Sequence, residues 1–199
     1  MKKLLLSLLI SATLMNVVYA KETGDIVRTQ CSTCHGADGN TTSDLYPILA
    51  GQNQEYIVNQ LKAYRDKTRT NLNAQRFMQG IASRLTDEEI NNLAQYYSSL
   101  KPIHKHRITD AVKYEAGREI FLKGNTEKGI PACAACHGEK ALGNQSIPSL
   151  AGQNAGYLKR QFAVFHTNER PSASSTMQQF VKNLDDMEVN ALAEYLQAQ

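Results

Sequence analysis

The sequence has little excess charge of either sign. Its 22 Lys and Arg side chains stand against 19 Asp and Glu, which gives a formal net charge of +3 over 199 residues. Proteins that bind nucleic acid through a basic surface concentrate far more positive charge. Apolar residues make up 42% and charged residues 21%, close to the globular average, so disordered and collagen-like chains are excluded as well.

The sequence also lacks a long hydrophobic segment. Its apolar run, residues 4–14, is shorter than the roughly 20 residues that a membrane-spanning helix needs. Two lysines precede the run and small residues end at Ala20, a pattern typical of a cleaved secretory signal peptide. An uncleaved anchor is the alternative, whereas a lipid anchor has no attachment site because no cysteine occurs in the first 30 residues. We expect a soluble protein exported to the periplasm.

Cysteine is scarce, and all four residues fall in two clusters, Cys31–His35 (CSTCH) and Cys133–His137 (CAACH). Disulfides, redox-active dithiols or a zinc site are alternatives. The histidine after each second cysteine favours covalent haem, because C-x-x-C-H is the attachment motif of c-type haem. Two thiols at this spacing can form thioethers with both vinyl groups of one haem, and the next residue places an imidazole below the iron. The sequence therefore predicts two haem c groups, attached at Cys31, Cys34, Cys133 and Cys136, with His35 and His137 as axial ligands.

The two clusters belong to an internal repeat. Residues 47–56 (PILAGQNQEY) and 148–157 (PSLAGQNAGY) match at seven of ten positions. Further on, LTDEE in the first half parallels LDDME in the second. Duplication explains this pattern. We expect four parts: a signal peptide (1–20), a first domain (21–101), a polar linker with a proline (102–109) and a second domain (110–199).

Helical periodicity dominates both halves, and no strand-like alternation of useful length occurs. Asn53 and Asn154 are expected to cap amphipathic helices that follow them. Capping boxes are expected where Thr86 precedes Glu89 and where Asp185 precedes Glu188. The stretches 66–84 and 167–182 look irregular. The predicted fold class is all-α.

The second axial ligand of each iron must come from elsewhere in the same half. Met78 is the only methionine of the first half after signal removal, and Met177 is its repeat partner. Methionine is often only a flexible core filler, but its repetition here favours a ligand. Met187 is rejected because it lies in a capped helix start and aligns with Glu88. His104, His106 and His166 are alternative ligands, yet the repeat gives them no counterpart.

Taken together, these motifs resemble the two-haem class I cytochromes c of the cytochrome c4 type. The resemblance rests on CSTCHG and CAACHG, on PILAGQ and PSLAGQ, and on the methionine segments that end in LTDEEI and LDDMEV. It covers essentially the whole mature chain and implies two tandem class I cytochrome c domains. It also implies His35 and His137 as proximal ligands, Met78 and Met177 as distal ligands, and Pro47 and Pro148 as carbonyl partners of the proximal imidazoles.

The family pattern further implies that the opening helix of each domain packs on the closing helix through a glycine and an aromatic residue. Gly117 and Phe121 facing Tyr195 satisfy this in the second half. In the first half Cys31 comes only seven positions after Gly24, with no aromatic residue between them. We therefore expect a short opening helix in the first domain.

The function that the resemblance implies is a periplasmic carrier of single electrons. Its donor would be a respiratory complex such as a membrane quinol–cytochrome c reductase, and its acceptor a haem-copper oxidase or another redox protein. Filled axial positions leave no open site for substrate chemistry, so we expect neither an enzyme nor a small-molecule substrate. Association with the membrane surface stays open.

Two alternatives of another class remain. The chain could be the cytochrome subunit of an enzyme such as a flavin-dependent sulfide dehydrogenase. A two-haem peroxidase is the other alternative, but paired methionines argue against it. The basic cluster Lys62, Arg65, Lys67, Arg69 and Arg76 fits a solvated helix face or a docking surface equally well.

Overall fold

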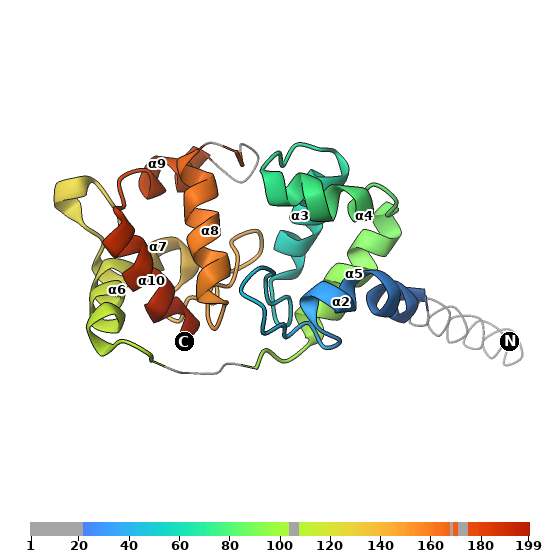
Figure 1. Cartoon of the computed structure of the whole chain (residues 1–199), viewed down its shortest axis with the longest axis horizontal. Coiled ribbons are helices and arrows are strands. Elements are labelled where there is room, and N and C mark those ends of the chain that lie inside the picture. The colour runs from blue at the N-terminus through green and yellow to red at the C-terminus, as the bar shows by residue number, and fades with distance from the viewer. Residues whose placement is uncertain (1–21, 104–107, 168, 171–174) are drawn as a thin grey trace, which may run out of the picture.

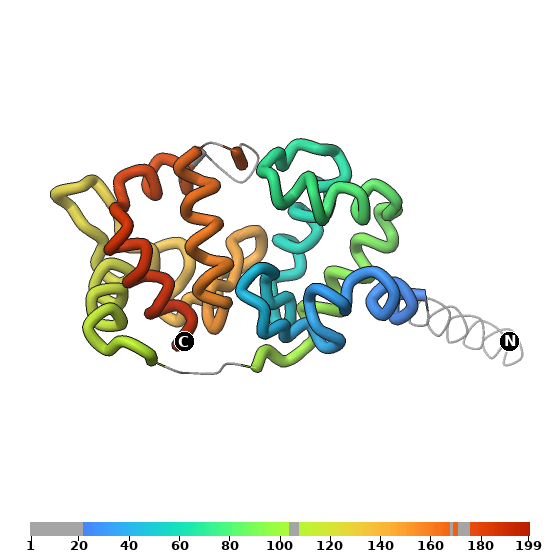
Figure 2. The backbone as a smooth tube through the Cα atoms, viewed as in Figure 1, coloured from blue at the N-terminus to red at the C-terminus, as the bar shows by residue number. Residues whose placement is uncertain are grey.

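A computed structural model describes residues 22–103, 108–167, 169–170 and 175–199. The predicted signal peptide, His104 and His106 lie outside these residues. Within them the chain forms helices and only isolated β-bridges, Asn125–Ile130 and Asn144–Ile147. The all-α prediction is confirmed. Figures 1 and 2 show two helical halves side by side, the first blue to green and the second yellow to red.

The first domain begins with continuous helix through the haem motif. Residues 22–26 are helical and lead into a π-helical segment, η1 (Val27–Cys31), and then α2 (Ser32–His35). The remaining elements are α3 (Gln54–Arg65), η2 (Ala74–Gln79), α4 (Gly80–Ala82) and α5 (Asp87–Ser99). The core includes Ile57 of α3 and Ile90, Leu93 and Tyr97 of α5. Whether the opening helix is short depends on residues outside the described part.

The second domain separates its opening helix from its motif. Its elements are α6 (Ala111–Lys123), η3 (Thr126–Lys128), α7 (Ala134–His137), α8 (Ala155–His166), α9 (Ser175–Val181) and α10 (Asp186–Gln197). Gly124 follows the last residue of α6 and has a positive φ of 74°. Phe121, Phe162 and Leu192 belong to its core.

The expectation of irregular structure at 66–84 and 167–182 is wrong in part. η2 and α4 occupy the first stretch, and α9 occupies the second. These segments are too short to be stable alone, so packing against the domain core holds them in helical form. The segments that carry Met78 and Met177 are therefore helical and not extended loops.

The capping boxes are confirmed. Glu89 N donates to Thr86 Oγ1 at 3.1 Å, and Thr86 N donates to Glu89 Oε2 at 2.7 Å. Asp185 and Glu188 make the same reciprocal pair, each bond 2.9 Å long. The closing helices α5 and α10 thus begin in the same way, because the same local chemistry is repeated in the sequence.

Asn53 and Asn154 stand before α3 and α8 as predicted, but neither side chain caps its helix. Both side chains reach into the other domain. Asn53 Nδ2 donates to the carbonyl oxygens of Leu142 and Ile147, at 3.1 and 2.7 Å. Asn154 Nδ2 has three carbonyl acceptors in the first domain, Thr41, Ser43 and Tyr46, at 3.0 to 3.3 Å. The capping prediction was wrong: a cap needs Oδ1 to accept from the first-turn amides, and in both residues the side-chain amide is instead oriented by bonds from Nδ2 to the other domain.

The adjacent glutamines complete a two-fold pattern across the interface. Gln52 accepts from Ser149 N at 2.8 Å and donates to Ser149 O at 2.9 Å. Gln153 accepts from Ile48 N at 2.8 Å and donates to Ile48 O at 3.0 Å. Equivalent residues of the repeat therefore meet equivalent partners, as in an isologous dimer interface.

Candidate functional site

Each CxxCH motif forms a single helical turn, α2 or α7. The following glycines, Gly36 and Gly138, have φ values of 84° and 74° and turn the chain away at once. A spacing of three residues places both cysteines of a motif on one side of that turn. None of the four cysteines forms a disulfide. Burial raises the pKa of Cys31 and raises the pKa of Cys133 to about 11, so both thiols are neutral at pH 7.

The two histidines are buried and held by proline carbonyls. His35 Nδ1 lies 3.0 Å from Pro47 O, and His137 Nδ1 lies 3.0 Å from Pro148 O. Burial lowers the pKa of both imidazoles and outweighs these bonds, which favour the charged form. A neutral ring that donates from Nδ1 leaves Nε2 free as a ligand atom. This is the tautomer that an axial haem ligand requires.

The predicted distal ligands lie on short helices of the same domains. Met78 belongs to η2 and Met177 to α9, and both are half-buried. Met177 packs against the second core. Aromatic contacts connect the methionine segment of the first domain to its histidine. Tyr46 lies edge-on to both His35 and Phe77, with ring centroids 6.0 and 5.8 Å apart.

The rejected ligands lie elsewhere. Met187 is 78% exposed at the start of α10. His166 is exposed at the end of α8. Among the described residues, no group of three or more His, Cys, Asp or Glu side chains could hold a metal ion.

The side chains present fit haem c. Each domain offers two free thiols on one side of a turn, a neutral imidazole with Nε2 free, and a thioether on a neighbouring segment. Thioether and imidazole are suitable axial ligands for haem iron. The donor chemistry of each half is therefore that of a c-type haem site.

Comparisons with known proteins agree. Residues 20–101 match the family described as cytochrome c, and residues 113–196 match the family described as cytochrome C oxidase, cbb3-type, subunit III. Cytochrome c4 of Pseudomonas aeruginosa is 32% identical, over 99% of this chain and 98% of that protein. This chain belongs to the two-haem cytochromes c of the cytochrome c4 type. It has two tandem cytochrome c domains and carries two covalently bound haem c groups.

Two further matches bear on the fold and the partners. The solved structure of Acidithiobacillus ferrooxidans cytochrome c4 has a TM-score of 0.80 and 36% identity, covering 86% of this chain and 99% of that chain. A protein described as thiosulfate dehydrogenase electron acceptor, from Thiomonas intermedia (strain K12), is 36% identical over 85% of this chain and 78% of that protein. This cytochrome therefore resembles electron carriers and an electron acceptor of an enzyme.

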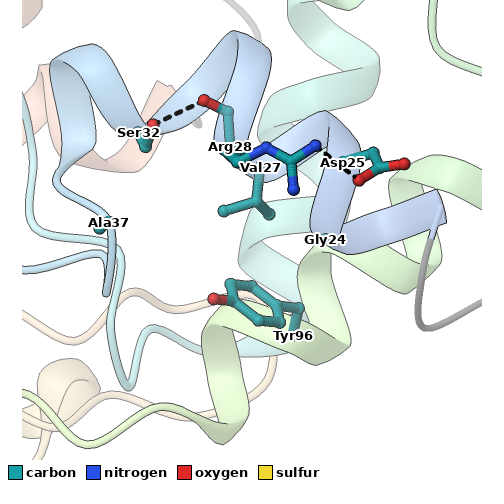
Figure 3. A pocket seen from close by; sticks show the side chains of 7 residues that line it. All are labelled: Gly24, Asp25, Val27, Arg28, Ser32, Ala37 and Tyr96. Carbon is teal, nitrogen blue, oxygen red and sulfur yellow. Dashed lines mark hydrogen bonds and ion pairs between the residues drawn. The ribbon is translucent and has the colours of Figure 1, made fainter.

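A pocket of about 420 Å³ opens on the first domain, beside the opening helix and the first haem motif. Figure 3 shows Val27 of the opening helix and Tyr96 of α5 facing it, with Arg28 turned to Asp25 in an ion pair of 3.0 Å. The lining residues are Gly24, Asp25, Val27, Arg28, Ser32, Ala37 and Tyr96. None of them is a predicted ligand, although Ser32 lies within the CSTCH motif.

The basic cluster of the first half is not a single solvated face. Arg65 pairs with Asp87 at 2.6 Å on the surface, whereas Arg69 is only 3% exposed. Arg170, at the equivalent repeat position, is also 3% exposed. Sequence reasoning missed this pair of arginines. Their recurrence at the same spacing as the two glutamines was the signal that could have found them.

Proposed function

We propose that this cytochrome carries single electrons in the periplasm, with His35 and Met78 as axial ligands of one iron and His137 and Met177 of the other. The observation that carries the proposal is repetition. Each domain has its own cysteine pair, its own buried imidazole held by a proline carbonyl, and its own methionine on a short helix. A fully ligated haem supplies one-electron redox chemistry and no open position for a substrate.

The protein residues prepare each haem for electron exchange. The cysteines fix the position of the haem, and the proline carbonyls orient the imidazoles and increase their basicity. The methionine sulfurs are soft ligands that favour ferrous iron and raise the reduction potential. In this proposal neither domain needs a proton donor, a nucleophile or a substrate pocket.

For partners, we propose a respiratory donor such as a quinol–cytochrome c reductase and an acceptor such as a haem-copper oxidase. The similarity to cytochrome c4 over nearly the whole chain supports a free carrier. The similarity to a thiosulfate dehydrogenase electron acceptor supports a second candidate function, in which the protein accepts electrons from a periplasmic dehydrogenase. A flavin-dependent sulfide dehydrogenase stays an alternative of the same kind.

We also propose cleavage of residues 1–20 on export, with a mature chain that runs from residue 21. The charged, apolar and small-residue regions of this segment support it. No helix among the described residues has the length and apolar character needed to cross a membrane. Intact mass spectrometry should show a chain that starts near Lys21 and carries two haems.

Axial ligation is tested by the near-infrared band that ferric haem shows when a methionine sulfur is bound. Met78→Leu and Met177→Leu should each remove about half of this band, because each breaks one of two sulfur–iron bonds. Met187→Leu is the matched control and should leave the band intact. Loss of the band in the control, or its full retention in Met177→Leu, would contradict the assignment in the second domain.

The choice of partner is tested by electron transfer from the fully reduced protein. A free carrier should pass both electrons rapidly to a haem-copper oxidase. If the oxidised protein were reduced at a useful rate by thiosulfate dehydrogenase and not by a quinol–cytochrome c reductase, the second candidate would replace the first. Rapid turnover of hydrogen peroxide by the intact protein, with methionine still bound, would contradict the carrier function altogether.

A further inference from the structure

Two arginines lie buried at the interface between the domains without an acidic partner. Arg69 follows α3 and Arg170 follows α8, and each side chain is almost fully enclosed. Among the described residues, no Asp or Glu side chain forms an ion pair with either guanidinium. Burial of an unpaired charge is costly, so this arrangement calls for an anion.

The two guanidinium groups are also close to each other. Gln60 Oε1 accepts from both arginines, at 2.8 Å each. Gln161 Oε1 also accepts from both, at 2.7 Å from Arg69 and 3.1 Å from Arg170. Because they share these acceptors, donor nitrogens of the two arginines lie within about 6 Å of each other. Like charges at this separation repel strongly inside a protein.

Neutral groups satisfy only part of the donor capacity. Arg69 Nε donates to Asn71 at 3.1 Å, and Arg170 also donates to Tyr56 OH at 2.7 Å. Each guanidinium lies over an aromatic ring, Tyr64 or Phe165, which provides no full negative charge. Arg170 Nε is buried and has no hydrogen-bond partner. A guanidinium has five N–H donors, so a carboxylate can still bind here.

The two guanidinium groups influence the pKa of a neighbouring phenol. Burial alone would raise the pKa of Tyr56, but Arg170 and Arg69 together lower it. Burial raises the pKa of Tyr64 to about 12, so that this phenol is neutral at pH 7. The pKa of Tyr56 is therefore lowered by two cations that no acidic side chain among the described residues pairs with.

Segments on the histidine side and on the methionine side of the predicted haem sites contact this interface. Ile48 and Ser149, which bind the interface glutamines, directly follow the prolines that hold the axial histidines. On the opposite side, Gln79 follows Met78 and donates to the Arg69 carbonyl at 2.9 Å. A haem bound through cysteines at its vinyl edge carries two carboxylates at the opposite edge, and these are the anions that the bound cofactors bring.

We infer that Arg69 and Arg170 neutralise haem carboxylates at the domain interface and so act as positioning and potential-setting residues shared by the two haems. The inference requires the haems but neither the methionine ligands nor any partner protein. A cation next to a haem destabilises the ferric state, which carries one more positive charge than the ferrous state. Each arginine therefore raises the reduction potential of the haem that it serves.

Spectroelectrochemical titration of the holoprotein tests the charge effect. Arg69→Gln and Arg170→Gln should each lower at least one midpoint potential, and Arg69→Lys and Arg170→Lys should restore most of the shift because the charge returns. Arg65→Gln is the matched control, since Arg65 lies nearby but already pairs with Asp87, and it should leave both potentials unchanged. Folded Gln variants with the potentials of the parent protein would overturn the inference.

A second variant tests whether the anion site is already filled. Gln60→Glu places a carboxylate between the arginines, and Asn59→Glu, on the exposed side of α3, is its control. If haem carboxylates occupy the site, Gln60→Glu adds a repelling charge and lowers both the melting temperature and the potential relative to Asn59→Glu. A rise in melting temperature would show unneutralised arginines. Midpoint potentials that changed with phosphate concentration would assign the site to a free anion, and either result would refute the inference.

Discussion

The two domains share one set of haem-binding residues but differ in how the opening helix meets the closing helix. In the second domain, Gly117 of α6 lies against the backbone of Ala191 and the Cβ of Tyr195 in α10. The rings of Phe121 and Tyr195 pack with centroids 5.3 Å apart. In the first domain, the space beside Gly24 is open, and a pocket lies between the opening helix and Tyr96.

The sequence spacing explains this difference. Arg28 stands four residues after Gly24, where the second domain has Phe121 four residues after Gly117. The first domain also runs its opening helix straight into the motif through a π-helical turn, whereas α6 and α7 are separated by a loop with η3. The haem-binding residues are therefore compatible with two different packings of the opening helix on the closing helix. The reason is that the CxxCH motif, the proline and the methionine segment lie outside the contact between these two helices.

The largest difference between the two domains is expected when the side chain four residues after the helix-packing glycine is truncated. Phe121 is fully buried, so Phe121→Ala should destabilise the second domain by about 4 kcal/mol. Arg28→Ala, at the corresponding position, should change stability by no more than about 0.5 kcal/mol. Calorimetric unfolding of the holoprotein measures both. Equal losses would show that the two crossings are energetically alike.

Substitution of Gly117 and of Gly24 by alanine should change the free energy of unfolding by amounts that differ nearly as much. A Cβ at Gly117 would overlap the carbonyl of Ala191, so Gly117→Ala should cost about 3 kcal/mol. Gly24→Ala meets no neighbouring atom and should be neutral or stabilising by up to about 1 kcal/mol, since alanine favours helix. Denaturant titrations with haem absorbance as the signal compare the two. A stable Gly117→Ala protein would contradict the close packing of α6 on α10.

The closing helix of the second domain carries a buried carboxylate that the closing helix of the first domain does not have at the equivalent position. Glu194 of α10 accepts from Thr109 Oγ1 at 2.9 Å and from Asp110 N at 3.0 Å. Burial acts to raise its pKa, but the amide donors of Thr109 and Asp110 outweigh burial and the pKa is lowered. Its stabilisation is therefore present above the unfolded-state pKa and is lost as pH falls through the folded-state pKa. The equivalent residue of α5, Gln95, is exposed.

Glu194→Gln should accordingly cost about 1.5 kcal/mol at pH 7. The difference from the parent protein should shrink in acid, where Glu194 is itself protonated. Unfolding midpoints between pH 3 and pH 7 measure this, with Gln95→Glu as the control that adds a carboxylate to the other closing helix. A difference that stayed constant over this range would rule out the carboxylate as its source.

The smallest expected effect comes from making the first domain resemble the second. Arg28→Phe should fill part of the pocket against Tyr96 and stabilise the first domain by about 1 kcal/mol. The ion pair lost with Asp25 is exposed and contributes little. Arg28→Gln removes the same charge without filling the pocket and serves as the control. If both variants had the same melting temperature, the pocket would not limit stability.

The site chemistry was accessible from the sequence because it is local. Cysteine spacing, the adjacent histidine and the capping boxes each depend on residues within a few positions of one another. The repeat supplied the longer-range inference, since it paired Met78 with Met177 and Pro47 with Pro148 before any contact was known. The proline–histidine contacts at 3.0 Å occur where the family resemblance placed them.

The helical class, the two haem motifs and the duplication all follow from patterns within short stretches of sequence. The partners of the repeated polar residues depend instead on how the two domains pack. Asn53 and Asn154 could have capped their helices, and Arg69 could have been solvated, because local chemistry permits both. Their hydrogen bonds cross between segments about 100 residues apart, and such contacts depend on which surfaces meet when two domains pack.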